Sequence, residues 1–130
     1  MSHAPLPPEV ERIAKIIVEC CFRVHSLLGP GLLESVYERC LCYELRKAGL
    51  RCERQVSLPI WYDGHELDDG LTLDLLVEGC VIVELKAVEA VLSVHTAQLM
   101  TYLKLSKNRL GFLVNFNVPR LKGHVKRYVI

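Results

Sequence analysis

Residues 71–86 read LTLDLLVEGCVIVELK. Two apolar runs flank a Glu78-Gly79 pair, a pattern that predicts a β-hairpin at the centre of the fold. Asp74, Glu84 and Lys86 are set into these runs. A charge inside an apolar strand costs several kcal/mol unless it is paired or binds a metal ion. These three side chains are therefore the first candidates for a functional site.

The loop of the predicted hairpin decides whether the three side chains meet. Residues two apart on a strand share a face, so Glu84 and Lys86 point to the same side of the sheet. A two-residue loop at Glu78-Gly79 would pair residue 77 with residue 80, so the numbers of any two paired residues would add up to an odd number. Asp74 and Glu84, whose numbers add up to an even number, would then lie on opposite faces of the sheet. A functional site here therefore predicts a three-residue loop, residues 78–80, or a β-bulge before Glu84.

The other elements follow from hydrophobic periodicity and turn signals. We predict helices over about 8–28, 32–48 and 94–107, with Leu33 facing inward on the second and Ser93 capping the third. A strand over 55–62, closed by Asp63-Gly64, carries Pro59 and is therefore placed at an edge. Two last strands are expected at 110–115 and about 124–129. The order α-α-β-β-β-α-β-β predicts one mixed α/β domain spanning residues 1–130.

Composition narrows the class of protein. The chain has 130 residues, 51% hydrophobic and 24% charged, as in compact globular domains. No apolar run approaches the roughly 20 residues that span a bilayer, and no signal-peptide pattern is present, so we expect a cytoplasmic protein that does not enter membranes. The six cysteines show no metal-ligand spacing, which favours reduced, buried thiols.

Charge is divided unevenly along the chain. Residues 1–85 hold 8 Lys and Arg against 14 Asp and Glu, a balance of −6, whereas residues 86–130 hold 8 against 1, a balance of +7. The basic C-terminal third could face a polyanion such as nucleic acid, and the acidic groups could hold a cation. The alternative is that the two parts interleave in space and their charges mix.

Two carboxylates and an ammonium group suit hydrolysis of a phosphodiester. Asp74 and Glu84 would hold Mg²⁺ (or Mn²⁺), a hard ion that prefers oxygen ligands, and the Leu85 carbonyl could add a ligand. The ion would polarise the phosphate, while Lys86 would orient the attacking water or neutralise developing charge. The alternative is a set of surface ion pairs on an exposed strand face.

Further residues could support such a site. Glu34 opens the second helix and is either a ligand or a first-turn acid favoured by the helix dipole. Gln98 is either an ordinary helix-surface residue or a group that orients the water or Lys86. We expect His25 and His95 to be structural or surface residues.

Several segments in a fixed order carry a resemblance to a known family. They are GLLESVY (31–37), DLLVE (74–78), VIVELKAVE (81–89), HTAQLMTYLKL (95–105), GFLVNFNVP (111–119) and KGHVKR (122–127). With these segments the chain resembles the GxxExxY proteins, small bacterial members of the PD-(D/E)XK nuclease superfamily. The resemblance covers nearly the whole chain.

The resemblance implies a restriction-endonuclease-like core, a small mixed sheet flanked by helices. It implies that Glu34 is the helix-borne glutamate, Asp74 the metal-binding aspartate, Glu84 and Lys86 the E-x-K half, and Gln98 the auxiliary glutamine. Thr72 stands where family members often carry Arg, so any phosphate contact from that position is lost or moved.

The expected function is therefore a Mg²⁺-dependent endonuclease acting on nucleic acid, with DNA favoured over RNA. The alternative is a non-catalytic nucleic-acid-binding or protein-interaction module of the same fold. A homodimer or a larger assembly is left open as the working form of either.

Overall fold

The structure, a computed structural model, describes residues 4–130. Three helices lie in this part of the chain: α1 (Pro8–Leu28), α2 (Glu34–Lys47) and α3 (Ser93–Ser106). The strands are β1 (Cys52–Leu58), β2 (Trp61–Tyr62), β3 (His65–Glu66), β4 (Leu71–Val77), β5 (Val81–Lys86), β6 (Leu110–Asn115) and β7 (Val125–Val129). The predicted α/β class is confirmed, and the predicted order holds apart from one added pair of short strands.

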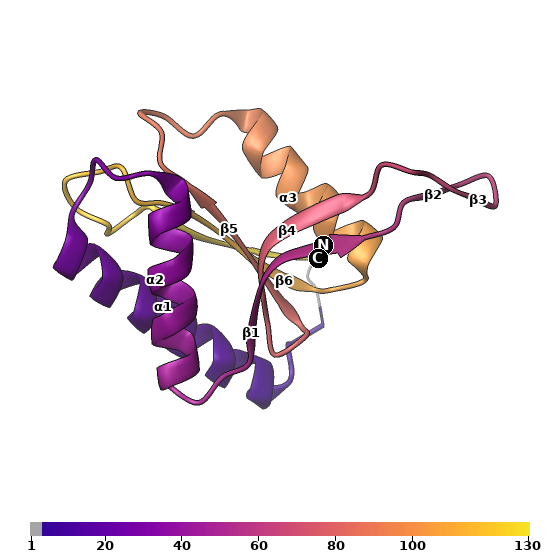
Figure 1. Cartoon of the computed structure of the whole chain (residues 1–130). Helices are drawn as coiled ribbons and strands as arrows, with labels where there is room; N and C mark the ends of the chain where they lie inside the picture. The colour runs from indigo at the N-terminus through magenta and orange to yellow at the C-terminus, as the bar shows by residue number, and fades with distance from the viewer. Residues whose placement is uncertain (1–3) are drawn as a thin grey trace.

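One mixed sheet of five strands forms the centre, in the order β1-β4-β5-β6-β7. The β5–β6 pair is parallel and the other neighbours are antiparallel. Buried side chains of α1 and α2 pack on one face of the sheet, and those of α3 pack on the other (Figure 1). The sheet is thus a middle layer, with both faces covered by the apolar sides of helices.

The central hairpin has the loop that the site required. Val77 pairs with Val81, which leaves residues 78–80 as a three-residue loop. Glu78 and Gly79 both adopt left-handed backbone angles, with φ of 51° and 65°, and the Cys80 amide donates to the Val77 carbonyl at 3.0 Å. The numbers of paired residues on β4 and β5 add up to 158, as do those of Asp74 and Glu84. The prediction that Asp74 and Glu84 share one face of the sheet is therefore confirmed.

The strand predicted over 55–62 is two separate pieces. β1 begins earlier and ends at Leu58, directly before Pro59, because proline cannot donate to a ladder. The next two strands, β2 and β3, form a hairpin around the predicted Asp63-Gly64 turn. This hairpin is an arm that projects from the body of the molecule (Figure 1). The edge position of β1 is as predicted.

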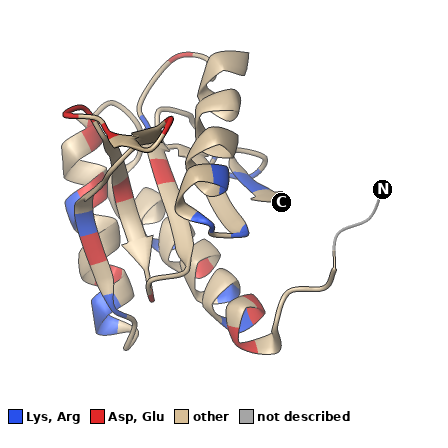
Figure 2. Ribbon diagram, turned by 90° about the vertical axis from the view of Figure 1, so that its right-hand side faces the viewer, with Lys and Arg blue, Asp and Glu red and all other residues tan. Residues whose placement is uncertain are grey.

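The arm differs from the body in charge and exposure. Trp61 and Tyr62 are 61% and 73% exposed. Asp and Glu lie along the arm without Lys or Arg (Figure 2). An aromatic and acidic surface of this kind suits contact with a protein better than contact with a nucleic-acid backbone.

Helix ends were predicted well, with two corrections. Gly29, with φ of 67°, follows the last residue of α1, as the Gly29-Pro30-Gly31 break indicated. Leu33 does not face inward: it is the residue before α2 and is 75% exposed. Ser93 is the first residue of α3 and makes no cap, since Leu92 occupies the cap position.

The acidic and basic parts of the chain interleave in space. β6 and β7 extend the sheet beside β5, and Arg127 of β7 donates two hydrogen bonds of 2.7 Å to Glu11 of α1. All six cysteines are free, and four of them are buried. Among residues 4–130, no helix combines the length and the apolar character needed to cross a membrane.

Candidate functional site

Asp74 and Glu84 form the centre of the candidate site. They lie on adjacent antiparallel strands, and Asp74 Oδ2 accepts a hydrogen bond of 2.9 Å from the Leu85 amide. Glu84 is 7% exposed. Burial, followed by a hydrogen bond with the Asp74 carboxyl and by its charge, raises the pKa of Glu84 to about 9. Glu84 therefore keeps its proton at neutral pH, beside the carboxyl group of Asp74.

One atom of this pair is unsatisfied. Glu84 Oε1 is buried and has no hydrogen-bond partner among residues 4–130. A buried oxygen without a partner costs free energy, and Mg²⁺ and Mn²⁺ bind such oxygens. The chemistry of the pair therefore fits a divalent cation. Within the same residues, no three or more His, Cys, Asp and Glu side chains are gathered closely enough to hold a metal by themselves.

Glu34 approaches the pair from α2, where it is the first residue. Burial and the neighbouring charge of Asp74 raise the pKa of Glu34, while Lys86 and the Ala87 amide act in the opposite direction. Glu34 is therefore within electrostatic range of Asp74 and Lys86. The role of Glu34 as the helix-borne glutamate of the site stays a prediction, and Glu34 does not complete a three-acid cluster within residues 4–130.

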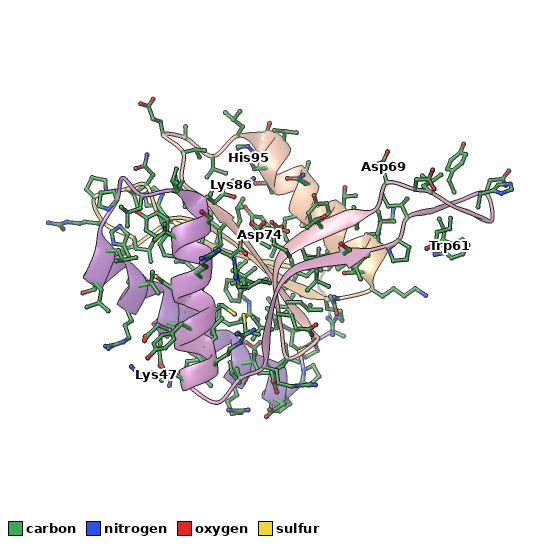
Figure 3. All side chains as sticks on the ribbon, in the orientation of Figure 1. Lys47, Trp61, Asp69, Asp74, Lys86 and His95 are labelled. Carbon is green, nitrogen blue, oxygen red and sulfur yellow. The ribbon has the colours of Figure 1, made fainter. Side chains whose placement is uncertain are left out.

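Lys86 is the last residue of β5 and is half-buried. It lies with Asp74 in the space between α2 and α3, far from the arm that carries Trp61 (Figure 3). Leu85, between Lys86 and Glu84, is fully buried, and its amide holds Asp74. The structure therefore brings Asp74, Glu84 and Lys86 together, with Leu85 as the backbone link.

A second buried acid escaped the sequence analysis. Glu38 is 5% exposed, and its carboxylate accepts hydrogen bonds from Arg54 Nε at 3.1 Å and from Gln55 Nε2 at 2.8 Å. The Gln55 amide also reaches Asp74 Oδ1 at 3.5 Å. This chain of contacts joins α2 to the carboxylate pair through β1. The spacing of Glu38, four residues after Glu34, was a signal, because such residues share a helix face.

Gln55 has an unusual backbone. Its φ of 52° lies in the left-handed region, and it is at the one position where the β1–β4 register is interrupted, opposite Asp74. The cost of such a conformation in a strand is of order 1–2 kcal/mol. Nothing in the sequence indicated this, because glutamine is not a residue type that favours the left-handed backbone conformation.

Gln98 lies on α3 and is exposed. Its Nε2 donates to the Tyr102 hydroxyl at 2.8 Å. Burial, followed by the charge of Glu84, raises the pKa of Tyr102, while the bond from Gln98 lowers it. Gln98 therefore binds Tyr102, a residue within electrostatic range of Glu84 that the sequence analysis missed. The i, i+4 spacing of the two residues was the available signal.

The two histidines considered have structural positions. His25 is buried, and its Nε2 lies 2.7 Å from the Val118 carbonyl. His95 Nδ1 accepts a hydrogen bond of 3.0 Å from the Leu92 amide at the start of α3. Both hold backbone segments rather than pointing to the carboxylate pair.

Comparison with known proteins agrees with this arrangement. No curated protein and no solved structure matches the chain. A family model described as PD-(D/E)XK nuclease superfamily matches residues 11–128. The match does not separate the GxxExxY proteins from other members, so that finer assignment stays a prediction. The five-stranded mixed sheet and its three helices fit the restriction-endonuclease-like core of that superfamily. The chain belongs to the PD-(D/E)XK nuclease superfamily.

Proposed function

We propose that this protein is a metal-dependent nuclease that hydrolyses phosphodiester bonds in nucleic acid. The observation that carries the proposal is the buried Glu84 on β5, whose Oε1 atom has no partner among residues 4–130, facing the half-buried Asp74 on β4, with Lys86 two residues further along β5. A protein that needed these residues only for stability would gain by pairing or replacing them.

Asp74 and Glu84 would hold Mg²⁺ or Mn²⁺, with the Leu85 carbonyl and Glu34 as further oxygen donors. When bound, the cation supplies charge stabilisation to the phosphate under attack and activates water. The contact from the Leu85 amide to Asp74 Oδ2 leaves Oδ1 with the long contact to Gln55, so the carboxylate is oriented before any ligand arrives.

The remaining residues act on water and on the phosphate. Lys86 lies two residues after Glu84, on the same strand face, and would orient the attacking water and offset the negative charge that develops on the phosphorane. Gln98 and Tyr102 would position groups near Glu84 from the α3 side. The bond between them fixes both side chains in one orientation, which favours positioning over direct proton transfer.

Nucleic acid is the proposed substrate, and DNA is favoured over RNA. Membership of a nuclease superfamily supports this substrate class. Basic residues of the C-terminal third, among them Lys126 on β7, lie on the sheet that bears the carboxylates and can contact a phosphate backbone. A cytoplasmic location and a homodimer remain predictions.

The test is cleavage of supercoiled, linear and single-stranded DNA and of RNA in Mg²⁺ or Mn²⁺. The wild type and the matched control Glu53→Gln, an exposed acid on β1, should cleave alike. Asp74→Asn, Glu84→Gln and Lys86→Ala should lose activity. Cleavage that survives these three substitutions would come from a contaminant and would remove support for the proposal.

The second candidate is a non-catalytic module of the same fold, favoured by the exposed aromatic arm around Trp61 and Tyr62, which resembles a protein-contact surface. Calorimetry with Mn²⁺ separates the two. Binding that Asp74→Asn abolishes supports the nuclease. No binding at millimolar metal supports the module.

A further inference from the structure

A pocket lies beside the candidate site, on the α3 side of the sheet. It has a volume of about 500 Å³ and is lined by β6, β7, the first turns of α3 and the segment before α3. This volume lies in the range of small-molecule sites. Asp74, Glu84 and Lys86 do not line it, so it is a separate space.

Strand pairing fixes how far the pocket lies from the carboxylates. Glu84 pairs with Leu113, and Leu113 pairs with Lys126, so the three residues form a row across β5, β6 and β7. Paired neighbours share a face, so all three side chains lie on the face that α3 covers. Two strand spacings amount to about 10 Å. A strand of nucleic acid placed with one phosphate at Glu84 therefore reaches the pocket within a nucleotide or two.

The lining of the pocket combines the groups that a nucleotide needs. Lys126 and His124 supply positive or ionisable nitrogen, against a single carboxylate from Glu89. Leu92 and Leu113 offer apolar surface. The ring of Tyr128 offers a further flat surface, and its hydroxyl is 3.3 Å from Thr96 Oγ1, which holds the ring in place. Aromatic and apolar walls bind a base, while a nearby cation binds its phosphate.

The wall that faces the carboxylates is fixed in advance. Asn115, which is 3% exposed, donates to the Val88 carbonyl at 2.9 Å and accepts from the Val88 amide at 3.2 Å. It pairs with Lys86 across β5 and β6. Asn115 thus joins the segment before α3 to the sheet, between the pocket and Lys86. These contacts hold the pocket at a fixed distance from the candidate site.

We propose that this pocket is a subsite for one unpaired nucleotide adjacent to the phosphodiester that is cleaved. The inference rests on the proposed nuclease function and adds a substrate class. A base held in a side pocket cannot remain in a duplex stack. The substrate is therefore single-stranded nucleic acid, or a flap or splayed end, rather than an intact duplex.

The first test measures binding without chemistry. Fluorescence anisotropy in EDTA compares a labelled single-stranded oligonucleotide with the blunt duplex of the same sequence. Lys126→Ala, which removes the cation, and Ala90→Trp, which fills the pocket from an exposed loop position, should weaken single-strand binding about fivefold to tenfold. Duplex binding should change less than about twofold, because backbone contacts outside the pocket remain.

Matched controls stand on the exposed face of α3. Lys104→Ala and Ala97→Trp make the same chemical changes away from the pocket lining and should leave single-strand affinity unchanged. Unfolding midpoints of all four variants establish that each folds. Equal losses for single strand and duplex, or losses with the controls as large as with the pocket variants, would overturn the subsite.

The second test locates the ligand. Titration of the ¹⁵N-labelled protein with a deoxynucleoside monophosphate should shift the amide resonances of Ser93 and Gly123, which line the pocket. Shifts confined to other regions, or none, would overturn the subsite even if the wild type cleaves nucleic acid. Shifts at these amides without any cleavage in Mg²⁺ or Mn²⁺ would instead leave the pocket as a nucleotide site and remove the nuclease function.

Discussion

Two regions of this molecule bury glutamates in opposite ways. Glu44 on α2 is 7% exposed and is paired with Arg23 at 2.9 Å and with Lys47 at 3.5 Å. Glu84 on β5 is equally buried, but the charged group with the largest effect on its pKa is another acid, Asp74, and one of its oxygens has no hydrogen-bond partner among the described residues. In the first region, side chains of the protein itself neutralise the buried carboxylate. In the second region, one carboxylate oxygen is left without a hydrogen-bond partner among residues 4–130.

The difference separates structural acids from functional ones. The desolvation cost of Glu44 is offset by Arg23 on α1 and by Lys47, three residues after Glu44 on α2. For Glu84, Lys86 and a backbone hydrogen bond offset only part of the desolvation cost, and Oε1 has no hydrogen-bond partner within residues 4–130. In the proposed nuclease, a divalent cation would supply further opposite charge to Asp74 and Glu84. Replacing the acid by its neutral amide should therefore lower the free energy of unfolding in the first region but not in the second.

The largest expected effect is on cleavage. Glu84→Gln should reduce the rate about 10²–10³-fold, because one charged group that stabilises the transition state is lost. The same variant should not be less stable than the wild type, because the desolvated acid is replaced by a neutral amide. Cleavage assays and urea unfolding at pH 7 measure both. A variant that loses activity and stability together would indicate that Glu84 is a structural acid like Glu44.

The second effect is on the pH dependence of stability without metal. The pKa of Glu84 is about 9 in the folded protein against 4.5 as the ordinary value, so the folded state binds more protons between these limits. The free energy of unfolding should therefore fall as pH rises from about 4.5 to 9, by up to about 1.4 kcal/mol per pH unit.

Urea unfolding at a series of pH values in EDTA checks this slope. In Glu84→Gln the part of the slope due to this acid disappears. The same slope in the variant and in the wild type would show that another group is responsible.

The third effect tests the paired region. Glu44→Gln should lower the free energy of unfolding by about 1–3 kcal/mol, because Arg23 and Lys47 lose a charged acceptor. Cleavage should not change, because Glu44 lies outside the candidate site. Glu19→Gln, an exposed acid on α1, is the control and should change stability by less than about 0.5 kcal/mol. Equal effects of the two substitutions would contradict the contrast.

The smallest effect concerns the backbone that supports Asp74. At Gln55, with φ of 52°, the Gly variant should be more stable than the Ala variant by about 1 kcal/mol, because glycine adopts the left-handed region freely. At Ser57, also on β1, the order should reverse, since glycine weakens an ordinary strand position. Thermal unfolding of the four variants measures both differences. If the Ala variant were the more stable one at both positions, the left-handed backbone at Gln55 would carry no strain.

Much of the fold could be predicted because it depends on local patterns. Gly29-Pro30-Gly31 ended the first helix, since glycine there takes φ of 67°. The loop over residues 78–80 followed from a parity argument, because side chains on a strand alternate with a fixed period. Leu33 and the strand over 55–62 were mispredicted, because the sequence did not show that Leu33 precedes the helix or that Pro59 starts an arm.

The candidate site was predicted in part for the same reason. Asp74, Glu84 and Lys86 stand out as charges in apolar strands, and the family resemblance added Glu34 and Gln98. Glu38 and Gln55 were missed, since their roles arise from contacts between α2, β1 and β4 that lie far apart in the sequence.

The sequence by itself determined the periodic elements, the hairpin register and the identity of the charged residues in the strands, because each depends on spacing along one segment. Only the tertiary structure decided which buried acids have partners. Pairing depends on distances between segments: Arg23 on α1 reaches Glu44 on α2, whereas Asp74 is what faces Glu84. Desolvation and Coulomb energies follow these distances, so the contrast between a structural acid and a functional one exists only in the folded chain.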